Sequence, residues 1–482
     1  MSAPALLVSA AHKSSGKTTV TLGLAAALAA RGRVVQPFKK GPDYIDPMWL
    51  SLAAGRPCLN LDPHLMAEPE IEATFARRLA GADIGLVEGN KGLYDGLALD
   101  GSNSNAALAR QLGLPVLLVL DARGMTRGIA PLILGYQAFD RDIRIGGVIL
   151  NRVGGSRHEA KLRAVIEHYT DVPVLGAVPQ DARLELVERH LGLMPDRELG
   201  DAPQRVRAMG ELIAERVDLD RVLALAASRT QADPALPAAV APPRHAGTPL
   251  RIGIARDKAF GFYYPDDLDA LVAEGAELVP VDTLADRQLP PALDGLFIGG
   301  GFPELFMAEL EANVSLRTSL HRAIVEGLPV YAECGGLMYL ARTLNWNGRS
   351  AQMVGAIPGD VVMHERPVGR GYVRVAETAE FPWRDDTSPP SVRLGHEFHH
   401  SSLENLDPSV RFAYRVQRGH GVDGSNDGVL VHHVLASYAH LRHTAGNDWP
   451  RRFMSYVRRL RDAGHPPLPR PLSTGEGAWS SH

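Results

Sequence analysis

The sequence predicts an α/β protein with two or three domains, and three observations support this. Short apolar runs alternate with helical stretches in both halves of the chain. The runs of the first half are almost continuously apolar, which is typical of a parallel sheet covered on both faces by helices. The chain has 482 residues, too many for one compact domain, and 45% of them are hydrophobic, so large cores can form.

The first half is expected to contain six strands with helices between them. Residues 17–30 are good helix formers and predict the first helix. The strands are predicted at residues 5–11, 33–38, 84–88, 116–121, 145–151 and 174–178.

A second alternating series follows a stretch that is rich in alanine and proline and has no periodicity. Strands are expected at residues 251–255, 277–281, 295–298 and 330–333, with helices at 266–274 and 316–326. From about residue 354 to 434 the pattern consists of short strand-like pieces and turns.

The domain organisation follows from these two series. We expect an N-terminal domain over residues 1–228, a linker over 229–248 and a second domain over 249–447. The tail, residues 448–482, is expected to begin as a helix and to be disordered from residue 465, where proline, serine and glycine dominate.

Composition excludes several classes of function. A net charge of −4 and a pI near 6.5 do not fit an electrostatic nucleic-acid binder. No apolar run approaches the roughly 20 residues that span a bilayer, and the N-terminus lacks the basic region of a secretory signal. Two cysteines, Cys58 and Cys334, cannot form a disulfide framework and fit a reducing cytoplasm.

A phosphate-binding loop is predicted at residues 11–18, between an apolar strand and a helix. Its sequence is the P-loop pattern with alanine in place of the first glycine. Amides at a helix start cradle phosphates, while the lysine reaches them and the threonine hydroxyl ligates Mg²⁺. The alternative is an ordinary strand–turn–helix with a lysine at its start. The predicted ATP-binding residues are Ser15, Gly16, Lys17, Thr18 and Thr19.

Carboxylates for Mg²⁺ are expected at the ends of neighbouring strands. Glu88 ends one predicted strand, and Asp43 and Asp46 follow another, so we predict a metal site formed by these three residues and Thr18. The alternative is that they are ordinary loop charges. Asn151 also ends a strand, where its amide could read the adenine edge or serve as a cap.

The second half carries a candidate nucleophile. Cys334 follows a strand and precedes two glycines and a helix, the thiol analogue of a nucleophile elbow. The helix start lowers the pKa of such a thiol. Gly299, Gly300 and Gly301 follow another strand, and their amides, with that of Gly335, could stabilise an oxyanion. A buried inert cysteine is the alternative, and it is the preferred interpretation for Cys58.

Such a thiol needs a histidine base, and physical chemistry alone cannot choose it, because the base is adjacent in space rather than in sequence. The clustered spacings match no standard zinc pattern, so no metal site is expected there. The candidates are His396, His399, His400, His432, His433, His440 and His443.

Together these motifs resemble the tetrapyrrole a,c-diamide synthases, the cobyrinate and hydrogenobyrinate a,c-diamide synthase family. In the first half the matching segments are Ser-Ser-Gly-Lys-Thr-Thr, Lys-Gly-Pro-Asp-Tyr-Ile-Asp-Pro, Glu-Gly-x-x-Gly-Leu-Tyr-Asp-Gly and residues 188–193. In the second half they are Gly-Gly-Gly-Phe-Pro-Glu, Ala-Glu-Cys-Gly-Gly-Leu-Met-Tyr, residues 366–372, Gly-His-Glu-Phe-His and residues 436–440. They run in family order from residue 5 to about 445.

The resemblance implies an N-terminal domain like dethiobiotin synthetase and a C-terminal class I glutamine amidotransferase domain. It implies Cys334 as the nucleophile and His440 as the histidine that activates it. It also assigns five residues to the ATP, metal and substrate site: Asp43, Tyr44, Asp46, Glu88 and Asp95. The residues expected on the substrate side are Lys39, Lys40, Tyr44, Lys91 and Asp95.

Three departures from the family pattern concern the substrate and the histidine segment. At Lys40 and at the pair Asn90-Lys91 the sequence resembles that of relatives that amidate siroheme or sirohydrochlorins. Arg442 stands where a further histidine is common. They leave the exact macrocycle open, but not the reaction.

The predicted function is ATP- and glutamine-dependent amidation of the a and c acetates of a polycarboxylate tetrapyrrole, through an acyl phosphate. The cofactors are ATP and Mg²⁺, and the partners are glutamine and the macrocycle, without nucleic acid or membrane. One alternative is a siroheme or sirohydrochlorin amidase, and another is a P-loop ATPase of partitioning or metal-chaperone type. The number and order of acetates amidated, the ammonia path and the oligomeric state, a homodimer included, stay open.

Overall fold

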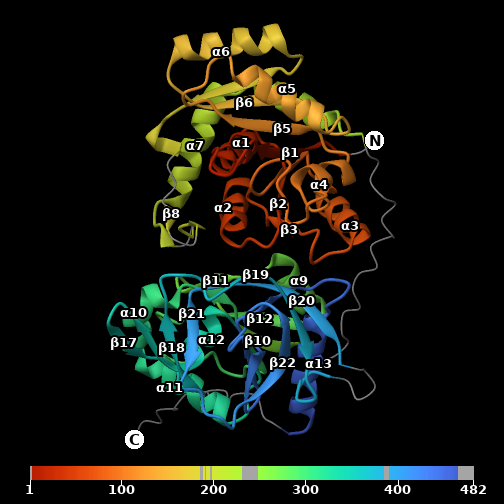
Figure 1. Cartoon of the computed structure of the whole chain (residues 1–482). Coiled ribbons are helices and arrows are strands. Elements are labelled where there is room, and N and C mark those ends of the chain that lie inside the picture. Colours follow the sequence, from red (N-terminus) through yellow and green to blue (C-terminus); the bar gives the residue numbers. More distant parts are fainter. Residues whose placement is uncertain are drawn as a thin grey trace, which may run out of the picture. The chain divides into compact units, whose positions relative to one another are not determined.

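The computed structural model describes residues 3–184, 188–189, 192–195, 198–230, 248–384 and 390–464 (Figure 1). The chain forms two compact units, Met1–Val240 and Ala241–His482. Most of the predicted linker and all of the tail from residue 465 lie outside the described residues. Within the described ranges, no helix combines the length and the hydropathy that crossing a membrane requires.

The first unit is built on a parallel sheet, as its apolar runs predict, but the sheet has seven strands, because the short β3 joins the six that were predicted. The strand order is β3-β2-β4-β1-β5-β6-β7. The strands are β1 (Ala5–Ala10), β2 (Val35–Lys40), β3 (Leu59–Leu61), β4 (Ile84–Glu88), β5 (Val116–Asp121), β6 (Ile145–Val153) and β7 (Val174–Pro179). Because β1, β2 and β4 are neighbours, the loops at their carboxyl ends lie side by side.

Helices cover the sheet of the first unit on both faces (Figure 1). Helices α3 to α6 share one apolar core with the strands, whereas α1 packs against β1, β2 and β4 with α2 and α7 beside it. The helices are α1 (Lys17–Ala30), α2 (Ile45–Ala54), α3 (Glu68–Leu79), α4 (Asn105–Gln111), α5 (Ile129–Phe139), α6 (Ser156–Tyr169), α7 (Ala202–Arg216) and α8 (Leu219–Ala227).

The second unit contains a ten-stranded mixed sheet in the order β12-β10-β13-β15-β24-β23-β22-β19-β20-β25. The pairs from β12 to β24 are parallel, and the rest are antiparallel. The strands are β10 (Leu250–Ala255), β12 (Ala276–Val281), β13 (Gly295–Ile298), β15 (Val330–Glu333), β19 (Gly369–Glu377), β20 (Val392–His399), β22 (Arg411–Arg418), β23 (Asn426–Val431), β24 (Val434–Ser437) and β25 (His440–Leu441).

Smaller elements complete the second unit. A four-stranded sheet has the order β17-β16-β18-β21, and a short pair joins β11 to β14. These strands are β11 (Phe260–Phe262), β14 (Gly300–Gly301), β16 (Ala341–Trp346), β17 (Arg349–Gln352), β18 (Ile357–Met363) and β21 (Ser401–Glu404). The α-helices are α9 (Pro265–Ala273), α10 (Met307–Ala312), α11 (Val314–Val325), α12 (Gly335–Leu340) and α13 (Trp449–Asp462).

Candidate active sites

The phosphate loop joins β1 to α1 through a turn that requires a left-handed backbone. Gly16 precedes the helix with φ of 85°, and Ser14 has φ of 63°. A Cβ on Gly16 would lie 2.1 Å from Asn151 Nδ2, so both the backbone angle and the space select glycine. No side chain of the described residues caps the start of α1. Its first amides and positive dipole end therefore suit an anion such as a phosphate.

Side chains from distant segments hold the carbonyls of this loop. Asn151 Nδ2 donates to the Ser15 carbonyl at 2.9 Å, and Arg152 Nη1 donates to the Ser14 carbonyl at 2.8 Å. The Tyr136 hydroxyl donates to the Ala11 carbonyl at 2.6 Å. The structure thus places the Asn151 amide against the loop itself. Sequence reasoning missed Arg152 and Tyr136, although Arg152 directly follows the strand-end Asn151.

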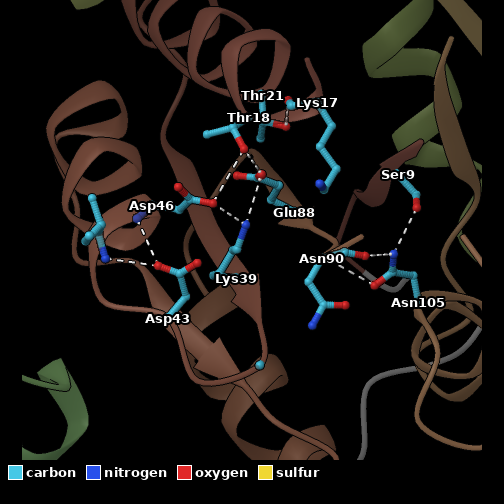
Figure 2. Close-up of polar contacts among 12 residues, drawn as sticks. Ser9, Lys17, Thr18, Thr21, Lys39, Asp43, Asp46, Glu88, Asn90 and Asn105 are labelled. Atoms are coloured by element: carbon cyan, nitrogen blue, oxygen red, sulfur yellow. Dashed lines mark hydrogen bonds and ion pairs between the residues drawn. The ribbon is translucent and has the colours of Figure 1, made fainter. Parts of the chain in front are cut away.

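Thr18 contacts the carboxylate of Glu88, which ends β4, and that of Asp46, which follows β2 (Figure 2). Its hydroxyl lies 2.5 Å from Glu88 Oε1 and 3.4 Å from Asp46 Oδ2. Lys39 Nζ lies between the same two carboxylates, 2.5 Å from Asp46 Oδ2 and 3.0 Å from Glu88 Oε1. Asp43 turns toward the start of α2, where its Oδ1 accepts from the amides of Ile45 and Asp46. Lys39, predicted on the substrate side, therefore lies inside the carboxylate cluster.

The donor set of this cluster fits Mg²⁺ that is also bound by phosphate. Glu88 is fully buried, yet its Oε2 has no hydrogen-bond partner among the described residues. Hydroxyl and carboxylate oxygens are the ligands that Mg²⁺ prefers, and one or two carboxylates suffice when phosphates supply the rest. Within the described residues, no group of three or more His, Cys, Asp or Glu side chains could hold a metal ion. The residues that fit Mg²⁺ are therefore Thr18, Glu88 and Asp46.

The ionisable groups of this cluster have shifted pKa values, because they are buried and lie close together. Burial raises the pKa of Glu88, and Asp46 adds to this while Lys39 opposes it. Desolvation, with Asp46 beside it, raises the pKa of Asp43 to about 7. Burial and then Lys39 lower the pKa of Lys17, whereas Asp46 and Glu88 overcome burial and raise that of Lys39. A divalent cation here would favour the charged carboxylates.

The other residues predicted on the substrate side lie at the end of β2 or in the segments that follow β2 and β4. Lys40 Nζ is 3.2 Å from Asn90 Oδ1, and burial lowers the pKa of Lys40 to about 8. Lys91 is exposed, with φ of 45°. Asp95 Oδ2 accepts from the Gly92 amide at 2.9 Å and so shapes the loop after β4. Tyr44 is buried directly before α2.

One residue at this edge had not been singled out from the sequence. Asn105, fully buried at the start of α4, donates through Nδ2 to the carbonyls of Asn90 and Gly92 at 2.6 and 2.9 Å and to Ser9 Oγ at 3.0 Å. Its Oδ1 accepts from the Asn90 amide at 3.1 Å. Asn105 thereby fixes the loop that carries Asn90 and Lys91, and links it to β1.

In the second unit, Cys334 occupies a strained turn between β15 and α12. Its backbone has φ of 48° and ψ of −101°, which is costly for a residue with a Cβ and is found at nucleophile elbows. The Cys334 amide donates to the Ser437 carbonyl at 2.7 Å. A Cβ on Gly336 would lie 2.3 Å from the Ile298 carbonyl oxygen, so the tight turn needs this glycine. The predicted elbow is present.

The structure brings His440 to the cysteine. A hydrogen bond to Cys334 is among the causes that, against burial, raise the pKa of His440 to about 10. On the other side of the ring, His440 Nδ1 lies 3.5 Å from Glu333 Oε2. Glu333, directly before the nucleophile, was not assigned a role from the sequence.

Two of the other candidate histidines, His396 and His399, are buried and stack on neighbouring rings. His396 stacks on His440 with ring centroids 4.9 Å apart, and burial followed by His440 lowers its pKa well below the usual value. His399 stacks on Tyr438, and its Nδ1 lies 2.8 Å from the Ser401 carbonyl.

Cys58 is buried in the first unit, and burial raises the pKa of its thiol well above the usual value.

The glycine loop after β13 contributes unequally to an oxyanion site. The Gly299 amide donates to the Tyr263 hydroxyl at 2.9 Å, so this amide is already engaged. Gly301 lies against the elbow, since a Cβ on Gly335 would come 2.9 Å from the Gly301 nitrogen. A Cβ on Gly300 would lie 2.6 Å from His440 Cε1. Gly300 and Gly301 thus lie beside His440 and Gly335 respectively, and Gly335 directly follows Cys334.

Two family models match the chain, one in each unit. Residues 251–448 match the CobB/CobQ-like glutamine amidotransferase domain, and residues 4–187 match an AAA domain. The chain is also similar over most of its length to curated proteins. The cobyrinate a,c-diamide synthase of Magnetococcus marinus is 49% identical over 92% of this chain and 95% of its own. The cobyrinate a,c-diamide synthase of Methanosarcina acetivorans is 43% identical over 92% of this chain and 93% of its own. The one of Listeria monocytogenes is 41% identical over 90% of this chain and 95% of its own.

Proposed function

The chain belongs to the cobyrinate a,c-diamide synthase family of glutamine-hydrolysing, ATP-dependent ligases, and on that premise we propose that it amidates the a and c acetates of cobyrinate or hydrogenobyrinate. One observation carries the proposal. A single chain contains a cysteine elbow with a histidine beside it and a phosphate loop with a carboxylate cluster beside it. The first set can release ammonia from glutamine, and the second can activate a carboxylate.

The glutaminase half-reaction uses the second unit. Cys334 Sγ attacks the carboxamide carbon of glutamine, and the amides of Gly301 and Gly335 stabilise the oxyanion. His440 passes the proton to the leaving ammonia, and the C–N bond breaks to leave a thioester. Water, deprotonated by His440, then cleaves the thioester to give glutamate and the free thiol. The reduced thiol that this requires fits a cytoplasmic enzyme.

The synthetase half-reaction uses the first unit. An acetate carboxylate of the macrocycle attacks the γ-phosphorus of ATP, which yields an acyl phosphate and ADP. Amides at the start of α1 and the ammonium group of Lys17 hold the phosphates. Thr18, Glu88 and Asp46 would hold Mg²⁺, which supplies charge neutralisation for the phosphates. Ammonia then attacks the acyl carbon, phosphate leaves, and the amide results.

Lys40, Asn90 and Lys91 favour one second candidate, a siroheme or sirohydrochlorin amidase. Lys40 Nζ contacts Asn90 Oδ1, and the neighbouring Lys91 of the same loop is exposed. Cations at this edge suit any macrocycle with many carboxylates. The geometry therefore supports the reaction class, and the choice of macrocycle needs a direct assay.

The decisive experiment is a panel of macrocycles. Purified protein is incubated with ATP, Mg²⁺, glutamine and one of cobyrinate, hydrogenobyrinate, sirohydrochlorin or siroheme, and each product is analysed by mass spectrometry. We expect two amidations of cobyrinate or hydrogenobyrinate. Amidation of the siroheme compounds alone would favour the second candidate, and ATP turnover without glutamine consumption would favour a P-loop ATPase. Light scattering on the same preparation tests for a homodimer.

A further inference from the structure

The carboxylate of Glu333 is held by three groups, one of which is the ring of His440. Glu333 ends β15, directly before the nucleophile, and is 2% exposed. Its Oε1 accepts from the Tyr331 hydroxyl at 2.5 Å and from the Leu441 amide at 2.9 Å. Its Oε2 lies 3.5 Å from His440 Nδ1. Two fixed donors on one oxygen therefore aim the other oxygen at the histidine.

We propose that Glu333 is a positioning residue for glutamine hydrolysis, accepting the Nδ1 proton of His440 so that Nε2 is left to exchange a proton with Cys334. This inference rests on the proposed glutaminase roles of Cys334 and His440. A carboxylate on Nδ1 fixes the tautomer and the orientation of a catalytic imidazole and stabilises the imidazolium. Such contacts tighten from lengths like 3.5 Å once substrate is bound.

The connectivity of the sheet explains why Glu333 lies beside His440. β15 pairs with β24 so that Glu333 lies opposite Ser437, and the chain reaches His440 three residues later. The Leu441 amide returns to Glu333 Oε1. The segment that carries the histidine is thus tied at both ends to the strand that carries the carboxylate and the cysteine, because the Cys334 amide also binds the Ser437 carbonyl.

The other charged and titratable groups around His440 do not duplicate this contact. His396, on β20, stacks on the ring, and its lowered pKa keeps it neutral there. Arg442, on the segment after β25, pairs with Asp266 at 2.7 Å. Asp267 accepts from the His443 amide and from Trp449 Nε1, and burial raises its pKa well above the usual value. Within the described residues, Glu333 is the carboxylate that is paired with His440.

The test is the pH profile of glutamine hydrolysis by the full-length Glu333→Gln variant. The amide keeps the acceptor for Tyr331 and Leu441 but presents an N–H to His440 Nδ1, which disfavours the required tautomer. We expect kcat for glutamine to fall by about 10²- to 10⁴-fold with KM changed less than about threefold, on the scale of such substitutions in catalytic triads. The alkaline limb of kcat/KM should also move to lower pH, because loss of the carboxylate lowers the pKa of His440.

Two further variants separate positioning from a structural role. Glu333→Asp restores the charge, so it should return the alkaline limb to its wild-type position even if kcat recovers only in part. Glu377→Gln alters another buried carboxylate of the same unit, held by Arg452 and Arg393. It should lower the melting temperature without moving the limb.

The melting temperature of each variant reports whether the second unit, which holds Glu333, is folded, and ammonium-dependent amidation reports whether the synthetase part of the proposed function holds. A Glu333→Gln profile like that of the wild type, while Cys334→Ala is inactive with glutamine, would overturn the positioning role alone. If Glu333→Gln and Glu333→Asp lose the same amount of glutaminase activity and the alkaline limb of kcat/KM stays in place, the positioning role is also overturned. Glu333 would then make a structural contact. A wild-type protein that hydrolyses no glutamine would instead refute the proposed function.

Discussion

The Thr18 hydroxyl donates to Glu88 Oε1 at 2.5 Å, although the two residues are 70 positions apart in the chain. The contact follows from the sheet, because β1 and β4 are parallel neighbours with Val8 opposite Glu88. The end of β4 therefore lies beside the loop that continues β1 into α1. A P-loop hydroxyl and a strand-end carboxylate in contact are the arrangement that binds Mg²⁺ with nucleotide phosphates.

Glu88→Gln should abolish ATP-dependent amidation with either nitrogen source. The amide keeps the size of the side chain but removes the charge that would balance the cation, so we expect a loss of about 10²-fold or more. The Mg²⁺ concentration needed for half-maximal rate should rise. Glutamine hydrolysis should survive, because Cys334 lies in the other unit.

A matched control is Glu159→Gln on α6, whose carboxylate pairs with Arg163 at the surface. This change should leave both half-reactions unaltered. Preserved ammonia-dependent amidation in Glu88→Gln would show that this carboxylate is only a loop charge. The phosphates would then depend on lysines alone, among them Lys39.

Lys40 should make the binding of the macrocycle depend on pH near 8. Burial lowers the pKa of this lysine to about 8 in the folded protein. Its ammonium group is therefore charged below that pH and is lost as the pH rises through it, while the acetates of the macrocycle stay ionised throughout. We expect kcat/KM for the macrocycle, at saturating ATP and glutamine, to fall above about pH 8.

Lys40→Arg is the control, because arginine keeps its charge over this range. The fall in kcat/KM for the macrocycle should be much smaller in this variant. An identical fall in Lys40→Arg and in the wild type would show that another group titrates and that Lys40 does not contact the substrate.

Much of both sites could be predicted because the motifs are contiguous in sequence. The phosphate loop and the cysteine elbow are each a strand, a turn and a helix start, so residue types at fixed offsets identify them. Glu88 could be predicted because it ends an apolar strand, and parallel strands bring their carboxyl ends together.

What could not be predicted depends on tertiary contacts. Asn105, Tyr136 and Arg152 hold loop backbones through single side chains, and nothing in their local sequence indicates which carbonyl they will meet. The same is true of Lys39, which lies between two carboxylates, and of Gly299, whose amide binds Tyr263. Local sequence alone left seven candidate histidines, and the placement of β25 determines which of them lies beside the thiol.

His440→Ala should reduce glutamine hydrolysis by about 10²-fold or more, the usual scale for loss of a general base. His399→Ala and His433→Ala should cost less, because His399 Nδ1 lies against the Ser401 carbonyl and His433 Nδ1 against the Tyr456 hydroxyl. Steady-state release of glutamate by the three variants gives the ranking. A ranking with His399→Ala as the most impaired would move the base to the Gly-His-Glu-Phe-His segment.

On the proposed function, one chain makes ammonia at Cys334 and uses it at a separate ATP site. The most direct measurement compares amidation of the accepted macrocycle by Cys334→Ala with glutamine and with an ammonium salt, using Cys58→Ala as the control. We predict that Cys334→Ala loses glutamine-dependent amidation but keeps ammonium-dependent amidation, and that Cys58→Ala retains both. Glutamine hydrolysis at the wild-type rate in Cys334→Ala would show that Cys334 is not the nucleophile.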